Sequence, residues 1–219
     1  MTDETSGVFI VLEGGEGTGK TTQLELLDDW LTGTGRAVLR TREPGGTAIG
    51  ERIRSLLLNH GQGEVDPRTE ALLFAASRAA HVEQKIRPAL DSGAVVLCDR
   101  YIDSSLAYQG AGRGLGTEGV AQINAWATRG LQPDLTVLLD LDPAVSAQRR
   151  AARDGGGPGD RIESADIEFH AALRQAFLDR AARAPERYLV LDAAQPVDDI
   201  SQAVRSALEP LLHRAGVAE

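Results

Sequence analysis

Glycines, one lysine and two threonines are concentrated in residues 14–21, which read Gly-Gly-Glu-Gly-Thr-Gly-Lys-Thr. This segment fits the pattern Gly-x-x-x-x-Gly-Lys-Ser/Thr. Glycines allow successive backbone N–H groups to point at phosphate oxygens, and the positive end of a following helix reinforces them. We expect Lys20 to reach the β- and γ-phosphates of a nucleotide and the Thr21 hydroxyl to ligate Mg²⁺. A glycine-rich turn that matches by chance is the alternative, and the apolar run before the segment and the helical stretch after it argue against this.

Asp99 is a second residue placed for metal chemistry. It follows the apolar run Ala94–Cys98, as the Walker-B carboxylate that organises Mg²⁺ follows a strand. An aspartate at the end of a strand is also a common helix cap. Together with the phosphate-binding pattern, we favour the metal role.

Apolar runs and helical stretches alternate along the chain and must position these residues. The runs that predict strands are 8–12, 37–41, 94–98, 135–139 and 187–191. The stretches that predict helices are 20–31, 66–90 (bent or ended near Pro88), 144–153, 166–184 and 198–213. Continuous apolar runs are typical of strands that are buried on both faces. The sequence therefore predicts an α/β fold, a doubly wound five-stranded parallel sheet flanked by helices. Residues 1–219 should form one domain, in which the glycine-rich segment 154–160 is a mobile loop between two helices.

Composition narrows the range of partners. The formal net charge of −9 argues against a surface for nucleic acid, because such binding depends on neutralising many phosphates. A local basic pocket for a small phosphorylated molecule remains compatible with it. The chain has one cysteine, an acidic N-terminus unlike a signal peptide, and no apolar run long enough to span a membrane. We expect a soluble cytoplasmic protein.

Among P-loop proteins, the sequence favours small-molecule kinases. Guanine-nucleotide switches need an Asn-Lys-x-Asp motif, which this chain lacks. Motors and transporters are usually longer. The acceptor is then a second small substrate that lies opposite the phosphate-binding loop.

Four segments of the chain resemble thymidylate kinases. They are Phe9–Thr22, the Thr-Arg-Glu-Pro-Gly-Gly-Thr segment at 41–47, Leu73–Arg78, and Asp99–Gly110 with its Asp-Arg-Tyr and Tyr-Gln-Gly motifs. Residues 160–163 and 192–196 continue the match, so that the resemblance covers nearly the whole chain. The second and fourth segments are much more specific than the phosphate-binding loop.

The resemblance implies the fold of P-loop NTPases of the nucleoside monophosphate kinase type, with a mobile lid at about 149–163. It also implies a reaction and its partners. The γ-phosphoryl group of ATP would pass to dTMP with the help of Mg²⁺, giving dTDP and ADP for dTTP biosynthesis, in a cytoplasmic homodimer. The helix at 74–90 is a candidate for the dimer face. Residues expected to bind ATP are Gly14, Gly15, Glu16, Gly17, Thr18, Gly19, Lys20, Thr21, Thr22, Arg149 and Arg153, with adenine near 192–196. Residues expected to bind dTMP are Glu16, Pro44, Phe74, Arg78, Arg100, Ser104, Ser105, Tyr108 and Gln109.

The resemblance also implies individual roles at the acceptor site. Glu16 would accept a hydrogen bond from the 3′-hydroxyl group, and Arg100 would clamp the acceptor phosphate. An ion pair of Arg100 with Asp99 or Asp103 is the alternative for this arginine. Phe74 would stack on thymine, although its apolar neighbours also suit a core position, and Arg78, four residues on, would bond a base carbonyl. Ser104 and Ser105 would contact the edge of the base, and Tyr108 would pack under the deoxyribose. Gln109 would lie on the substrate side of the site, and Pro44 would border the nucleotide.

The catalytic set expected is Lys20, Arg100, Glu16 and a lid arginine. Gly17 occupies the position at which some family members carry an arginine in the phosphate-binding loop. The chain is thus similar to the bacterial subclass in which the lid supplies this arginine, which can contribute about 10³ to 10⁵ in rate. Arg153 is our choice, and Arg149, Arg150 and Arg161 stay open. A kinase for another nucleoside monophosphate or for a deoxynucleoside, or a nucleotide-gated binding ATPase, are the alternative functions.

Overall fold

The computed structural model describes residues 7–59, 61, 63–154 and 167–215. Its centre is a parallel sheet of β1 (Val8–Glu13), β2 (Val38–Arg42), β3 (Val95–Asp99), β4 (Leu135–Asp140) and β5 (Tyr188–Asp192), in the order β2-β3-β1-β4-β5. All five predicted strands are present, and their observed ends differ from the predicted ends by about one residue at most. The three central strands are nearly completely buried, as their unbroken apolar runs predict.

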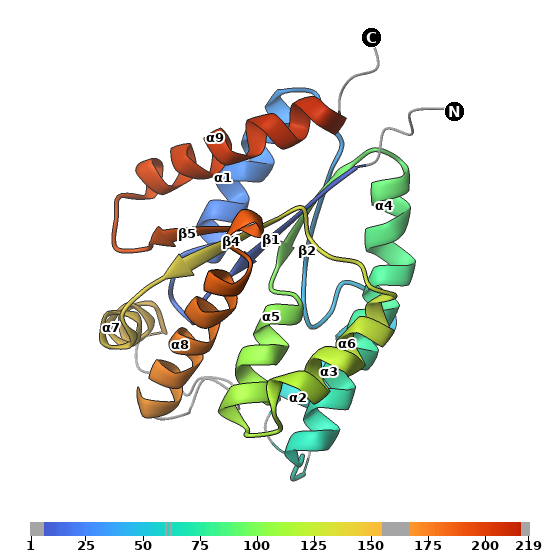
Figure 1. The fold of residues 1–219 in the computed structure, drawn as a ribbon, viewed down its shortest axis with the longest axis vertical. Coiled ribbons are helices and arrows are strands. Elements are labelled where there is room, and N and C mark those ends of the chain that lie inside the picture. Colours follow the sequence, from blue (N-terminus) through green and yellow to red (C-terminus); the bar gives the residue numbers. More distant parts are fainter. Residues whose placement is uncertain (1–6, 60, 62, 155–166, 216–219) are drawn as a thin grey trace.

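Helices cover both faces of this sheet (Figure 1). On one face, α1 (Lys20–Gly33) and α9 (Val197–Ala215) pack against Val8, Ile10 and Leu12. The intervening residues Phe9 and Val11 point to the other face. There they meet the π-helical segment η1 (Val82–Ile86) and the helices α5 (Ile102–Ser105) and α6 (Thr117–Thr128), while α8 (Ile167–Arg183) packs on β4. The predicted doubly wound α/β architecture is confirmed.

One long helical stretch lies between β2 and β3. It consists of α3 (Pro67–His81), η1 and α4 (Arg87–Asp91). Asp66 caps its start by accepting hydrogen bonds from the backbone N–H groups of Arg68 and Thr69. Pro88 cannot donate to an i−4 carbonyl, and the wider turn of η1 directly precedes it. The helix therefore passes Pro88 and ends at Asp91, one residue beyond the predicted end.

The structure also contains helices that the sequence reading missed. They are α2 (Ala48–Leu58), α5 with the π-helical segment η2 (Leu106–Gly112), and α6. Thr47 caps α2, where its hydroxyl oxygen accepts from the N–H of Gly50 at 3.0 Å. The α2 segment looks like a loop in sequence because Gly45, Gly46 and Gly50 surround this cap. The remaining elements are α7 (Pro143–Asp154) and the short helix η3 (Pro185–Arg187).

Within the described segments, no helix is both long and apolar enough to cross a membrane.

Candidate active site

A pocket of about 460 Å³ opens at the carboxyl ends of β1, β2 and β3, where open α/β sheets bind their ligands. It extends from the phosphate-binding loop to α3 and η2. Among the residues that line it, basic side chains outnumber acidic ones: Lys20, Arg42, Arg54, Arg78, Arg100 and Arg149 against Glu16, Glu43 and Asp99. A protein of net charge −9 thus concentrates positive charge at one place, which suits a small molecule with several phosphates.

The phosphate-binding loop connects β1 directly to α1. Gly14 has φ 134°, and a Cβ atom there would lie 2.4 Å from the Leu139 carbonyl oxygen, so that only glycine fits. Gly19 (φ 92°) starts α1, whose first turn carries Lys20 and Thr21 toward the pocket. The Lys20 ammonium donates to the carbonyl oxygens of Gly15 at 2.7 Å and Gly14 at 3.3 Å. Burial lowers the pKa of Lys20, and Arg100 lowers it further, whereas nearby carboxylates raise it.

Asp99 lies at the end of β3, in register with Leu12 of β1 on one side and Arg42 of β2 on the other. Its Oδ1 atom is buried and has no hydrogen-bond partner among the residues described. An unpaired buried carboxylate oxygen beside the first turn of α1 suits a cation. Among the described residues, no group of three or more His, Cys, Asp or Glu side chains could hold a metal ion. A metal ion here would therefore be bound by Thr21 and Asp99 together with the phosphates of a bound nucleotide.

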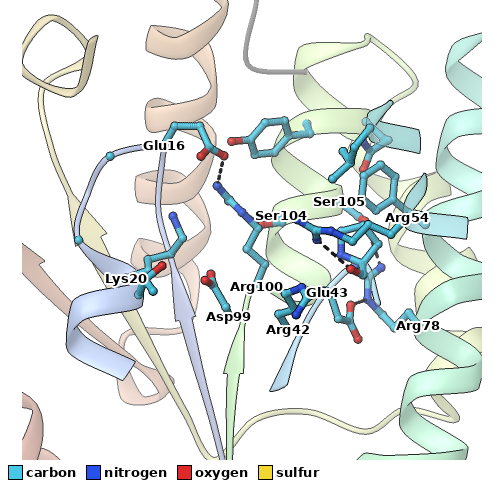
Figure 2. A pocket seen from close by; sticks show the side chains of 18 of the residues that line it. Glu16, Lys20, Arg42, Glu43, Arg54, Arg78, Asp99, Arg100, Ser104 and Ser105 are labelled. Carbon is cyan, nitrogen blue, oxygen red and sulfur yellow. Dashed lines mark hydrogen bonds and ion pairs between the residues drawn. The ribbon is translucent and has the colours of Figure 1, made fainter. Parts of the chain in front are cut away.

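Arg100 connects the phosphate-binding loop to the rest of the pocket (Figure 2). Its backbone is left-handed (φ 68°), a conformation uncommon outside glycine that aims the side chain back across β1. The guanidinium forms an ion pair with Glu16 and donates to the Gly14 carbonyl oxygen at 2.9 Å and to Ser104 Oγ at 3.1 Å. It also lies over the Tyr108 ring, 5.4 Å from its centroid. The ion pair expected as the alternative, with Asp99 or Asp103, is not the one formed.

Glu13, which sequence reasoning missed, supports this turn. The Glu13 carboxylate accepts hydrogen bonds from the backbone N–H groups of Tyr101 (2.8 Å) and Ser104 (3.1 Å) and from the Ser104 hydroxyl (2.6 Å). The Ser104 oxygen in turn accepts from Arg100, so that a chain of bonds connects Glu13 to the guanidinium. Burial, and then the charge of Asp103, raise the pKa of Glu13 to about 7. A charged residue that ends an otherwise apolar run was the available signal.

Arg78 lies at the centre of a buried network below the far end of the pocket. It is 1% exposed and donates to Glu43 at 2.5 Å, to Ser105 Oγ at 3.0 Å, to the Tyr101 carbonyl oxygen at 2.9 Å and to Asn124. Four of its five N–H groups are therefore engaged within the protein. Any contact of Arg78 with a ligand rests on the one that remains. Ser105 supports Arg78 in the same way that Ser104 supports Arg100.

Glu43 is shared by two partners. Besides Arg78, its carboxylate bonds His81 Nδ1 at 2.9 Å, and His81 Nε2 lies 2.7 Å from the Thr41 hydroxyl. These contacts connect the segment after β2 to α3. The Thr41–Thr47 motif contains Glu43, and its carboxylate was not assigned a role from sequence.

The other residues expected at the acceptor end also line this pocket. They are Pro44, Phe74, Tyr108 and Gln109. Phe74 is half-buried and packs against the core cluster that contains Tyr108, so it takes part both in the core and in the pocket wall. Arg54, on the unpredicted α2, lines the pocket as well and donates to the Pro44 carbonyl oxygen at 2.9 Å.

The segment predicted to form a lid lies partly outside the described residues. Arg149 of α7 lines the pocket and donates to the Ala193 carbonyl oxygen at 3.0 Å, beside the loop expected to bind adenine. The backbone of Arg150 and Arg153 belongs to α7, but their side chains lie outside the described part of the structure, as does all of Arg161.

Comparison with known proteins gives a consistent answer. The family model described as thymidylate kinase matches residues 12–204. The chain belongs to the thymidylate kinase family. A thymidylate kinase of Cutibacterium acnes is 53% identical over 95% of this chain and 99% of its own length. The thymidylate kinase of Deinococcus radiodurans is 53% identical over 95% and 100%. Among solved structures, the crystal structure of thymidylate kinase from Ehrlichia chaffeensis matches with a TM-score of 0.74 and 33% identity, covering 93% of this chain and 99% of that one.

Membership of the thymidylate kinase family confirms the resemblance stated from the sequence. It also confirms the predicted fold and the class of enzyme, a nucleotide-binding phosphotransferase. Most of the predicted site residues line one pocket, whereas Gly14, Gly15 and Thr18 lie in the loop beside it and the Arg153 side chain lies outside the described part of the structure. The roles of all these residues remain predictions.

Proposed function

We propose that this chain transfers the γ-phosphoryl group of ATP to dTMP and releases dTDP and ADP, a step of dTTP biosynthesis. The observation that carries the proposal is the position of Arg100. It lies in the same pocket as the phosphate-binding loop and is joined to that loop through Glu16 and Gly14. A site built in this way holds two phosphorylated molecules end to end, which is what phosphoryl transfer between nucleotides requires.

The donor end is the segment Gly14–Thr22 with Arg149. Backbone N–H groups of the loop and the N-terminus of α1 bind the phosphates of ATP, and the Lys20 ammonium neutralises the transferring group. Arg149 lies near the adenine ring, because its bond to Ala193 fixes it at the loop that follows β5.

The acceptor end begins at Arg100, whose planar guanidinium suits a phosphate monoester. When dTMP binds, Arg100 exchanges part of its contact with Glu16 for the phosphate, and the Glu16 carboxylate accepts from the 3′-hydroxyl group. Tyr108 packs below the deoxyribose, and Phe74 stacks on the base. Pro44, Arg78, Ser105 and Gln109 surround the base edge, while Ser104 acts mainly through its bond to Arg100.

The magnesium ion is part of this proposal. Thr21 and Asp99 would hold Mg²⁺, and the unpaired Oδ1 atom of Asp99 fits a cation or one of its water ligands. Bound there, the ion supplies positive charge that neutralises the phosphate oxygens during transfer.

The remaining positive charge comes from the lid. Gly17 leaves the phosphate-binding loop without an arginine, so we assign that role to Arg153 at the end of α7. Residues 1–219 act as one kinase domain with a lid at about 149–163. Closing the lid would exclude water, which protects ATP from hydrolysis.

We further propose a cytoplasmic homodimer whose interface is the outer face of α3 and α6. A groove there is lined by apolar and small side chains: Leu72, Ala75, Ala76, Ala79, Gln122, Ile123, Trp126 and Ala127. Trp126 is 84% exposed and Leu72 is 56% exposed, which is costly for large apolar side chains gathered in one patch. The single cysteine, Cys98, is free and buried, which agrees with a reducing compartment.

Nucleotide-dependent release of ADP tests the function. In a coupled assay with ATP and Mg²⁺, we expect fast release with dTMP and much slower release with dCMP, dGMP and UMP, and almost none after chelation of Mg²⁺. Equal turnover of UMP would contradict the thymidylate assignment and favour a kinase of broader specificity. Slow ADP release that no nucleotide stimulates would instead point to a nucleotide-gated ATPase.

A further inference from the structure

Glu70 is a buried carboxylate outside the pocket that contacts the pocket wall. It lies on α3, is 1% exposed, and is not among the residues that line the pocket. Its Oε1 atom accepts a hydrogen bond from Gln109 Nε2 at 3.0 Å and a longer one from Arg113 Nε at 3.4 Å. Gln109 belongs to the π-helical segment η2, and Arg113 is the first residue after η2. Glu70 therefore connects α3 to the segment that forms one wall of the pocket.

This contact determines which end of the Gln109 amide faces the pocket. A side-chain amide has one accepting end and one donating end, whereas a carboxylate only accepts. The NH₂ group of Gln109 must therefore face Glu70, and its carbonyl oxygen must point away. That oxygen is buried and has no hydrogen-bond partner among the described residues, although Gln109 itself lines the pocket. A buried acceptor without a donor destabilises the protein, so this position suits a ligand that brings a donor.

We propose that Glu70 is a positioning residue that sets base specificity by holding the Gln109 carbonyl oxygen toward the base. This inference rests on the proposed function. The thymine ring carries an N–H donor at N3, which matches the oxygen of Gln109. The cytosine ring carries an unprotonated acceptor at N3, which would face that oxygen as a second acceptor. Uracil shares the N3–H of thymine, so Glu70 separates thymine and uracil from cytosine and leaves the 5-methyl group to other residues.

Arg113 offsets the cost of burying the Glu70 carboxylate. Its guanidinium supplies the opposite charge and lies over the Phe169 ring, 5.5 Å from the centroid, which fixes it beside Glu70. Arg113 does not line the pocket, and no described contact joins its side chain to the Gln109 oxygen; only its backbone N–H, which a substitution keeps, donates to the Tyr108 carbonyl oxygen at 2.9 Å. It is therefore a matched control, because a change at Arg113 disturbs the cluster but leaves an acceptor for the Gln109 amide.

The test compares kcat/KM for dTMP, dUMP and dCMP in the full chain carrying Glu70→Met. Methionine keeps a similar volume but removes the acceptor, so the Gln109 amide can turn and present its NH₂ group to the base. We expect the dTMP-to-dCMP ratio to fall by about 10-fold to 100-fold, as a buried hydrogen bond is lost for one base and gained for the other. The dTMP-to-dUMP ratio should stay unchanged. Arg113→Met should keep both ratios near those of the wild type.

A conservative variant protects the test against misfolding. Glu70→Gln keeps one accepting oxygen but can also donate, so it weakens the orientation of Gln109 without abolishing it. We expect a severalfold fall in the dTMP-to-dCMP ratio, smaller than for Glu70→Met. If Glu70→Met gives no folded protein, judged by thermal unfolding, an unchanged ratio in Glu70→Gln overturns the inference.

Two other outcomes are distinguishable. Equal losses for all three nucleotides in Glu70→Met, with the ratios unchanged, would mean that Glu70 only stabilises the fold and would overturn the positioning role while the function stands. Failure of the wild-type protein to phosphorylate dTMP would instead contradict the proposed function itself.

Discussion

Arg100 has the most connected position among the residues proposed to act. Glu16, Gly14 and Ser104 all accept hydrogen bonds from it, and the buried Glu13 holds Ser104 in place. Charge-assisted hydrogen bonds are roughly twice as strong as neutral ones, so these contacts fix the guanidinium before the acceptor phosphate arrives. Preorganisation of this kind lowers the entropic cost of binding.

Replacing Arg100 tests its role as the phosphate clamp. In Arg100→Ala we expect the KM for dTMP to rise by about 10-fold to 100-fold, because hydrogen bonds to charged groups contribute roughly 1.5–3 kcal/mol. The KM for ATP should change much less. Arg40→Ala is the control, since the Arg40 side chain forms an exposed pair with Glu25 and does not line the pocket, and its kinetics should match the wild type. An unchanged KM for dTMP in Arg100→Ala would return this arginine to a structural role.

The raised pKa of Glu13 predicts a pH-dependent stability. In the folded chain the pKa is about 7, against the ordinary value of 4.5, so the folded state holds the proton more tightly. Its contribution to stability is full below pH 4.5 and is lost as the pH rises to about 7. Relative to Glu13→Gln, the wild type should lose up to ~3 kcal/mol of unfolding free energy across this window. Denaturant titrations at pH 4.5, 6 and 7.5 would measure the difference, and a constant value would contradict the shift.

At the scale of elements, short segments rather than whole helices determine the site. The loop after β1, the left-handed turn after β3 and the π-helical η2 each place side chains that regular helices would direct elsewhere. The helix α7 is tied to the same region, because Ser146 donates a hydrogen bond to the Glu16 carbonyl oxygen. The phosphate-binding loop is thus bonded directly to the helix that precedes the proposed lid segment.

Replacing Arg153, near the end of α7, tests the proposed catalytic role of this arginine. In Arg153→Ala we expect kcat to fall by about 10³ or more while both KM values change little, because the arginine interacts with charge that develops in the transition state. Steady-state kinetics of Arg150→Ala and Arg161→Ala, measured in parallel, should show smaller losses. A change in KM alone for Arg153→Ala would place the catalytic arginine elsewhere in the lid.

At the scale of the whole molecule, much of the fold follows from local patterns in the sequence. The runs Val8–Leu12 and Ala94–Cys98 predict buried strands, and the glycines and Lys20 after the first run predict the phosphate-binding loop. By contrast, the helix Ala48–Leu58 is hidden by the glycines around its cap. The partnerships of Glu13 with Ser104 and of Glu70 with Gln109 join residues 91 and 39 positions apart, and no local periodicity encodes such contacts.

The proposed dimer is also a property of the whole molecule. Trp126→Glu places a charge in the apolar groove between α3 and α6, and we expect it to convert a dimer into monomers in analytical ultracentrifugation. Val197→Glu is the control, because Val197 is another exposed apolar residue, at the start of α9, and does not line the groove. A monomeric wild-type protein, or a Trp126→Glu protein that remains dimeric, would contradict this interface.

Direct observation of the transferred group tests the central claim most closely. The full chain would be incubated with ATP labelled at the γ-phosphorus, dTMP and Mg²⁺, and the nucleotides would then be separated. We predict that the label appears in dTDP with the wild-type protein and is almost absent from dTDP with Lys20→Ala, which lacks the ammonium beside the transferring phosphoryl group. Label released only as inorganic phosphate, or equal labelling of dTDP with Lys20→Ala, would contradict transfer at this site.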